Sequence, residues 1–115
     1  MTRKIETQMI QSIVNDESFK KDNTKVINNK TYFDIYLHDH KIAVYYPNSM
    51  KLHINNCGWS TRTTKSRLNA LIQFVEGGLS GIYQKRGQWY LKRPNQSDVA
   101  MNDNTWLTVY LSFYL

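Results

Sequence analysis

The sequence predicts a single α+β domain in which two helices pack on a mainly antiparallel sheet, in the element order αβββαβββ. Its length of 115 residues suits one hydrophobic core and leaves no room for two. Hydrophobic residues make up 41% of the chain, which is enough apolar material to exclude global disorder. Two segments have the residue spacing of an amphipathic helix, and most of the others have strand-like patterns. Helices gathered on one face of an antiparallel sheet are the natural packing for this order.

The first predicted helix covers residues 2–14. Thr2 can cap its start, and Asn15-Asp16 can end it. Its apolar residues recur as they do along one helix face: Ile5, Met9, Ile10, Ile13 and Val14. The stretch that follows, residues 16–30, is polar and rich in Asn and Lys, and it predicts a loop.

Three strands follow in the prediction. Residues 32–37 and 41–46 are rich in β-forming side chains and flank His38-Asp39-His40, which indicates a hairpin with a polar tip. A second turn is expected at Pro47-Asn48-Ser49. Residues 50–55 alternate between apolar and polar side chains, as a half-buried strand does.

The second helix has the clearest pattern in the chain. Gly77-Gly78 marks its end, and Thr61, Thr63 or Thr64 can cap its start. Its apolar residues fall at i, i+3, i+4 and i+7: Leu68, Leu71, Ile72 and Val75.

The C-terminal part predicts a hairpin and a last strand. Residues 81–85 and 88–92 flank Arg86-Gly87, a turn signal. A polar stretch, residues 93–104, then precedes a strand over residues 105–115. That strand has one wholly apolar face and one amphipathic face that begins with Trp106. The amphipathic face can lie under a helix or meet a partner.

Composition limits the setting and the partners. Cys57 is the single cysteine, so an intrachain disulfide is excluded and a reducing compartment is favoured. We find neither the pattern of a signal peptide nor an apolar run long enough for a membrane span, and we expect a soluble protein in the cytoplasm. The net charge of +6 favours polyanionic partners.

The most informative stretch is residues 59–67, which we call the basic segment. The first turn of the second helix holds cations where most helices place Asp or Glu: Arg62, Lys65 and Arg67. Hydroxyl groups surround the same helix start: Ser60, Thr61, Thr63, Thr64 and Ser66. Free N–H groups, hydroxyls and guanidinium ions together favour contact with phosphate. The alternative is a solvated basic helix start, with an acid supplied from elsewhere in the fold.

Three neighbours of the basic segment bear on the same hypothesis. Trp59 can stack on a base, although a Trp before a helix more often anchors the core. Lys85 and Arg86, at the second hairpin, can extend the basic surface or remain solvated. The hypothesis predicts that Lys65→Glu combined with Arg67→Glu abolishes binding without unfolding the domain.

No catalytic pattern is recognisable in the sequence. His38-Asp39-His40 resembles a metal motif with His53 as a third ligand, but the tripeptide lies where the hairpin turns, and we favour the turn. Neither a nucleophile elbow nor a glycine-rich phosphate loop is present. We therefore expect no enzyme, no catalytic residue, no metal and no cofactor.

Much of the chain resembles a group of small uncharacterised proteins of tailed bacteriophages. The resemblance is carried by residues 36–43, 51–53, 57–70 and 81–90, and residues 58–69 are its most specific part. It implies expression inside an infected bacterium, and no activity or site residue comes with it. It also implies two functional classes, the handling of nucleic acid and the blockade of a host or defence protein.

Our leading hypothesis is a non-enzymatic phage accessory protein that binds DNA or RNA. Arg62, Lys65 and Arg67 would contact phosphate, Thr63 and Thr64 would donate hydrogen bonds, and Trp59 would stack. The main alternative is an inhibitor that binds a host or defence protein through the last strand or a sheet edge. A third possibility is a sponge for a signalling nucleotide, with a pocket between subunits. We expect no membrane partner, and a homodimer remains open.

Overall fold

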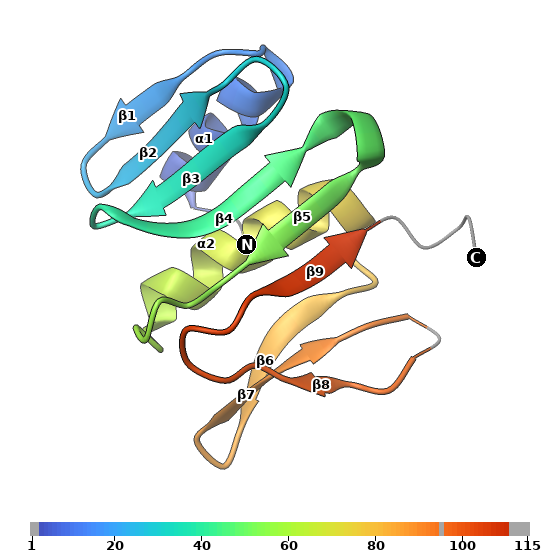
Figure 1. The fold of residues 1–115 in the computed structure, drawn as a ribbon. Coiled ribbons are helices and arrows are strands. Elements are labelled where there is room, and N and C mark those ends of the chain that lie inside the picture. The colour runs from blue at the N-terminus through green and yellow to red at the C-terminus, as the bar shows by residue number, and fades with distance from the viewer. Residues whose placement is uncertain (1–2, 95, 111–115) are drawn as a thin grey trace.

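The computed structural model describes residues 3–94 and 96–110 of the chain. Their strands form two separate antiparallel sheets, and the two α-helices lie on one side of the larger sheet (Figure 1). This confirms the predicted α+β class and the order in which helix, strands, second helix and strands follow one another. It differs from the prediction of one sheet, because the C-terminal hairpin forms a sheet of its own.

The larger sheet, which we call the main sheet, has six strands in the order β1-β2-β3-β4-β5-β9. Each strand pairs antiparallel with its neighbour. The chain therefore meanders from β1 to β5, and β9 returns at the end to pair with β5. The bounds are β1 Phe19–Lys21, β2 Thr24–Asn28, β3 Phe33–Leu37, β4 His40–Tyr46, β5 Lys51–Ile54 and β9 Leu107–Tyr110.

The smaller sheet consists of β6 (Gly81–Lys85), β7 (Gln88–Lys92) and β8 (Val99–Ala100). The side chain of Asn69, on the second helix, holds this sheet in place. Its Oδ1 accepts a hydrogen bond from the Ile82 N–H at 2.7 Å, and its Nδ2 donates to the Ile82 carbonyl at 3.1 Å. The helix thus pairs with β6 through an amide side chain, which leaves these backbone groups of β6 satisfied.

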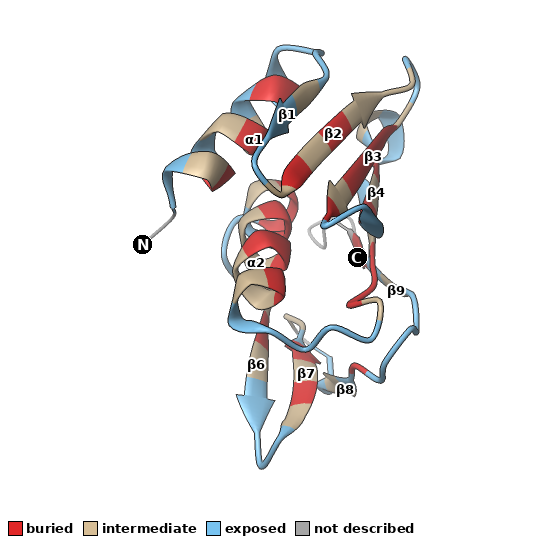
Figure 2. Cartoon of the chain, turned by 90° about the vertical axis from the view of Figure 1, so that its left-hand side faces the viewer, coloured by how far each residue is buried: buried red, intermediate tan, exposed pale blue. Residues whose placement is uncertain are grey.

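Helix α1 (Lys4–Val14) and helix α2 (Arg62–Glu76) cover one face of the main sheet. In Figure 2 both helices lie on the same side of β2, β3 and β4, and their buried residues face the sheet. Helix α2 ends at Gly77, which has a φ of 86° and caps it in the left-handed conformation, as the sequence predicts. The core lies between helices and sheet, and its fully buried side chains include Met9, Ile35, Leu52, Leu68 and Leu71.

Three further predictions about the elements were wrong or only partly right. Residues 16–30, expected to be a loop, contain the β1–β2 hairpin, because Phe19 and Val26 are cross-strand neighbours that pack toward the core. The polar stretch 93–104 contains β8. The last strand begins at Leu107 rather than at residue 105, and its predicted part from residue 111 onward lies outside the described residues.

The other boundaries agree closely with the sequence. Pro47–Ser49 forms a short 3₁₀ helix at the predicted second turn. Helix α1 ends at Val14 with Asn15 as its C-cap, and its N-cap is Arg3; the predicted cap, Thr2, lies outside the described residues. None of the helices in the described part of the chain is both long and apolar enough to cross a membrane.

A β-bulge in β4 decides which side chains face the helices. Ile35 pairs with Ala43, whereas the next residue, Tyr36, pairs with Lys41, so Ile42 is the extra residue. The bulge allows Ile42 and Ala43 both to be buried, although adjacent strand residues normally face opposite sides. It also places His40, the pairing partner of buried Leu37, on the helix side of the sheet.

Candidate functional site

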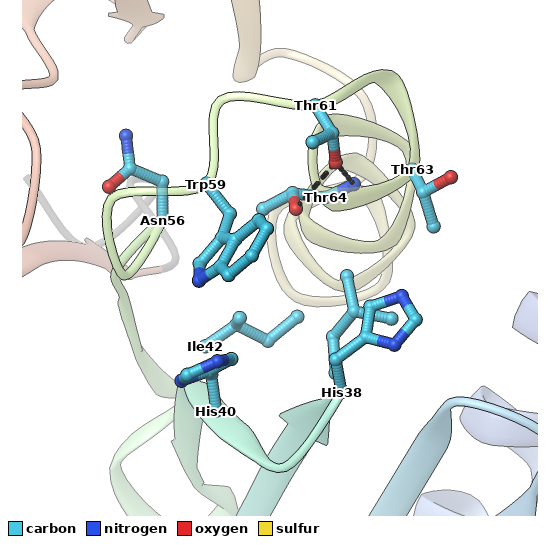
Figure 3. Close-up of a pocket in the computed structure, with 9 residues that line it drawn as sticks. His38, His40, Ile42, Asn56, Trp59, Thr61, Thr63 and Thr64 are labelled. Atoms are coloured by element: carbon cyan, nitrogen blue, oxygen red, sulfur yellow. Dashed lines mark hydrogen bonds between the residues drawn. The ribbon is translucent and has the colours of Figure 1, made fainter.

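A pocket of about 210 Å³ lies between the β3–β4 turn and the start of α2 (Figure 3). We call it the Trp59 pocket. Its apolar residues come from the main sheet, its rings come from the turn and from the segment before α2, and its hydroxyl groups come from the first turn of α2. The lining residues are Leu37, His38, His40, Ile42, Asn56, Trp59, Thr61, Thr63 and Thr64.

The first wall of the pocket is the histidine turn. His38 and Asp39 have φ values of 50° and 63°, and positive φ at both central residues is what a two-residue type I′ hairpin turn requires. The expectation that this tripeptide forms a turn is therefore confirmed. The turn also has a second consequence, since His38 and His40 both line the pocket.

The opposite wall is Trp59, which is 54% exposed and therefore not a core anchor. Its ring centroid lies 5.6 Å from that of His40, with 37° between the ring planes. Figure 3 shows the two rings facing each other at one end of the pocket, with Ile42 close to them. A large apolar ring is thus held at the surface beside a concave site, an arrangement suited to stacking with a planar ligand.

Asn56 fixes the loop that presents Trp59. This residue is fully buried, and its Oδ1 accepts from the N–H groups of Gly58 at 2.9 Å and Asn104 at 3.2 Å. Its Nδ2 donates to Asp103 Oδ1 at 3.1 Å. The amide therefore ties the loop to the segment before β9. The N–H of Trp59 itself donates to the Asn56 carbonyl at 2.8 Å, so the backbone that carries the ring is hydrogen-bonded to a buried residue and Trp59 is pre-positioned.

The third wall is the start of α2, which two threonines cap. Thr61 Oγ1 accepts from the Thr64 N–H at 3.1 Å and lies 2.9 Å from Thr64 Oγ1. Thr64 is 1% exposed, so its hydroxyl belongs to the cap and does not extend toward solvent. In Figure 3 the hydroxyl of Thr63 lies on the side away from Trp59. The predicted hydrogen-bond donors therefore do not converge inside the pocket.

The three cations of the basic segment, Arg62, Lys65 and Arg67, lie in different environments. Arg62 is exposed and Lys65 is half-buried, and within the described residues neither has a carboxylate oxygen within 4.0 Å. The first turn of α2 contains no acidic residue either. Both side chains, which are sequence neighbours of the pocket-lining threonines, are therefore accessible, and their contact with an anion stays a prediction.

Arg67 requires a correction. Its side chain is only 4% exposed, and its Nη1 lies 2.6 Å from Oε2 of Glu6 on α1, whose side chain is 2% exposed. Its Nε donates to Thr24 Oγ1 at 3.0 Å. The acid supplied from elsewhere in the fold is thus Glu6, and it also accepts from Ser66 Oγ at 2.6 Å. Arg67 joins α2 to α1 and β2 and does not face an external phosphate.

Lys85 and Arg86 are exposed at the tip of the β6–β7 hairpin, where Arg86 has a φ of 52° in the predicted turn. They do not line the Trp59 pocket. His53 also lies apart from the histidine turn, because its Nδ1 is 2.9 Å from Thr108 Oγ1 on β9. Within residues 3–94 and 96–110, no group of three or more His, Cys, Asp or Glu side chains is arranged to hold a metal ion.

Cys57 lies in the same loop as Trp59 but belongs to the scaffold. It is partly buried, and its Sγ donates to the Lys41 carbonyl at 3.0 Å. Burial raises the pKa of the Cys57 thiol above its ordinary value. A raised pKa keeps the sulfur protonated near neutral pH, which does not suit a nucleophile.

Two contributions to the pocket were missed by sequence reasoning. The first is the pair His38 and His40, for which the sequence favoured a role in the turn. The signal that could have placed both rings at one site was their spacing of two, which lets them face the same side. Asn56 carried no signal, because its partners are Gly58 in the next turn and Asn104 far along the chain. The site thus combines ring walls that suit a planar group with the side chains of Arg62 and Lys65, which have no carboxylate partner within the described part of the chain.

Comparison with known proteins identifies the family. The model of the Kyanoviridae Gp96 protein family matches residues 2–110, which is nearly the whole chain and includes every residue of the Trp59 pocket. No curated protein and no solved structure matches. The family description names no enzymatic activity. The resemblance to small tailed-phage proteins is thus confirmed, and the chain belongs to the Kyanoviridae Gp96 protein family.

Proposed function

We propose that this protein binds single-stranded nucleic acid without catalysing a reaction, and that one base stacks in the Trp59 pocket. The observation that carries the proposal is an exposed Trp59 ring, held by hydrogen-bonded backbone and in ring contact with His40, that forms one wall of a concave site. Base–aromatic stacking contributes about 1–3 kcal/mol per base and requires an unpaired base.

The size of the pocket favours a base over a larger ligand. Its volume of about 210 Å³ lies below the ~300–1,000 Å³ of pockets that enclose drug-sized molecules. One planar ring system between Trp59 and His38 suits that volume better than a whole dinucleotide does. The apolar floor of Leu37 and Ile42 supports a flat ring and offers no charge to a phosphate.

The charges outside the pocket favour a nucleic acid over a neutral aromatic ligand. Arg62 and Lys65 lie on the same helix start as the pocket-lining Thr61, Thr63 and Thr64, and they have no carboxylate partners among the described residues. At a helix start they oppose the helix dipole, a cost of roughly 0.3–1 kcal/mol each that a bound phosphate would remove. The proposal assigns phosphate contact to these two side chains and leaves out Arg67.

The test is fluorescence anisotropy with labelled single-stranded DNA and RNA of about 12 nucleotides, titrated between about 50 and 200 mM salt. We expect Trp59→Ala to weaken binding by about 5- to 150-fold, the equivalent of one lost stack. Arg62→Gln with Lys65→Gln should lower the slope of log affinity against log salt by about 1.4, since each single-strand phosphate contributes about 0.7.

The matched control is Trp106→Ala, because Trp106 is 46% exposed but does not line the pocket. Equal affinity of wild type and Trp59→Ala would contradict the proposal. A mononucleotide that binds as tightly as the oligonucleotide would instead favour a nucleotide sponge.

A second candidate function rests on Trp106 itself. This exposed side chain directly precedes β9, the last strand in the order of the main sheet. An exposed Trp at a sheet edge is a common anchor of protein interfaces. If the protein inhibits a host protein through this edge, Trp106→Ala should abolish capture of one bacterial protein in a nuclease-treated lysate, and Trp59→Ala should leave it intact.

A further inference from the structure

The outward face of the main sheet, which neither helix covers, carries two rows of side chains suited to a polyanion with unpaired bases. In Figure 1 this face is turned toward the viewer, with α1 and α2 behind it. The antiparallel register brings together residues from β1 to β5 that lie far apart in the sequence.

The first row is cationic and crosses four strands. Lys20 pairs with Lys25, Lys25 with Tyr36, and Tyr36 with Lys41. The Nζ atoms of Lys25 and Lys41 lie 4.7 and 6.0 Å from the centroid of the Tyr36 ring. The β4 bulge is required for this row, since it keeps Lys41 on the outward face while Ile42 and Ala43 are buried.

The pairing of Lys20 with Lys25 is unfavourable in the isolated protein. Like charges directly opposite each other on neighbouring strands destabilise a sheet, because their β-carbons lie within about 4.5–5.5 Å. Compensation is small, since Lys25 reaches Asp39 only at 3.9 Å and that carboxylate is 93% exposed. A bound phosphate would turn this repulsion into attraction.

The second row is aromatic and lies nearer the end of β4 that leads into the 3₁₀ helix Pro47–Ser49. The ring of Tyr46, which is 37% exposed, lies 5.6 Å from that of Tyr32 and 5.5 Å from that of His53. Exposed Lys51 pairs with Tyr46 across β4 and β5. This row offers ring faces to bases and one cation to a phosphate, the combination that binds single strands on a sheet.

Charge complementarity identifies the occupant of this face. It carries Lys20, Lys25, Lys41 and Lys51, and the acid between the two rows, Asp34, is largely buried and paired with Lys41 at 3.5 Å. An acidic protein could satisfy the lysines, but it would leave the tyrosine row without a matching feature. A single strand satisfies both rows.

We propose that this face is a second binding surface for single-stranded nucleic acid, with phosphates on the lysine row and a base on Tyr46. The inference rests on the proposed function and extends it from one base to a path across the sheet. The connection between the two surfaces runs past His38, which lines both the Trp59 pocket and a neighbouring hollow whose charged lining residues are Lys20, Lys25, Asp22 and Asp39.

The test compares a trinucleotide with a single strand of about 12 nucleotides, both labelled for fluorescence anisotropy. Lys20→Gln with Lys25→Gln should lower the salt slope of the longer strand by about 1.4, equivalent to about 25-fold in affinity at 0.1 M salt. Tyr46→Ala should weaken the same strand by about tenfold through one lost stack. The trinucleotide, of which the Trp59 pocket holds one base, should be little affected by either change.

The matched control is Lys85→Gln with Lys92→Gln, which removes the same charge from two exposed lysines of the smaller sheet. An identical salt slope for the two double variants would overturn the proposal, and so would equal binding of a duplex, whose bases cannot stack on Tyr46. If Lys20→Gln with Lys25→Gln has the same urea-unfolding midpoint as the wild type, its lower salt slope does not result from a loss of stability. If Trp59→Ala binds with wild-type affinity while Lys20→Gln with Lys25→Gln lowers the salt slope, the assignment of a base to the Trp59 pocket fails. The proposed binding surface on the main sheet then stands.

Discussion

Replacing Arg67 by methionine would leave the carboxylate of Glu6 buried without its cation. The two groups lie 2.6 Å apart, with side chains 4% and 2% exposed. The Ser66 hydroxyl and the Arg3 N–H, at 2.6 and 3.2 Å, would remain as hydrogen-bond donors to Glu6. Breaking a buried ion pair by removing one partner costs about 3–5 kcal/mol. Out of a total stability of about 5–15 kcal/mol for a domain, this is a large loss.

The assay is urea unfolding followed by tryptophan fluorescence, for which buried Trp89 is a suitable reporter. We expect Arg67→Met to lower the free energy of unfolding by about 3–5 kcal/mol. Lys65→Met removes a cation that has no carboxylate partner among residues 3–94 and 96–110, and it should change that free energy by less than about 0.5 kcal/mol. Glu6→Met combined with Arg67→Met should recover most of the loss, since apolar replacement of a whole buried pair is often neutral.

A loss below about 1 kcal/mol for Arg67→Met, the value typical of an exposed pair, would refute this reasoning. Arg67 would then be a surface cation, and its predicted contact with phosphate would return. The same logic changes the expectation for Lys65→Glu combined with Arg67→Glu. The second substitution places a carboxylate beside buried Glu6, so we expect unfolding, and loss of binding in that variant would carry no information about phosphate contact.

Two further predictions concern the scaffold around the site. Because burial raises the pKa of Cys57, its thiolate fraction at pH 8 should be smaller than that of an unfolded chain. Iodoacetamide should therefore alkylate the native protein more slowly than the urea-unfolded one, with a rate that rises at higher pH; equal rates would show that the thiol is unshielded. Asn69→Ala removes both hydrogen bonds to Ile82 and leaves backbone groups of β6 unpaired, which should cost about 1–3 kcal/mol. Hydrogen exchange should then speed up in β6 and β7 more than in β3, whereas a uniform increase would contradict a local role.

Sequence patterns predicted those elements that depend on interactions between residues a few positions apart. The 3.6-residue period of Leu68, Leu71, Ile72 and Val75, followed by Gly77, predicted α2 almost to the residue. Arg86-Gly87 predicted the β6–β7 turn, because positive φ at both positions suits the twist of a hairpin. The β1–β2 hairpin was missed, because it buries few residues and its pairing depends on β3 beyond it.

The candidate site, too, was predicted only in part from the sequence. The sequence marked Trp59, Arg62 and Lys65 from the unusual charge of a helix start, and the structure leaves all three at least partly accessible. It could not separate Lys65 from Arg67, because both are cations in one turn of one helix. The difference arises from α1, whose Glu6, 61 positions from Arg67 in sequence, pairs with Arg67 and not with Lys65.

The sequence by itself determined that this chain is a basic α+β domain of a tailed-phage type, with its helix boundaries and most of its turns. These features depend on periodicity, capping and turn chemistry, which act between residues a few positions apart. Only the tertiary structure decided that Arg67 is buried, that the histidine turn faces Trp59 and that Lys20, Lys25 and Lys41 share one row. Each of these depends on sheet register or helix packing, where contacts join distant segments and a shift of one residue would reverse which side chains are exposed.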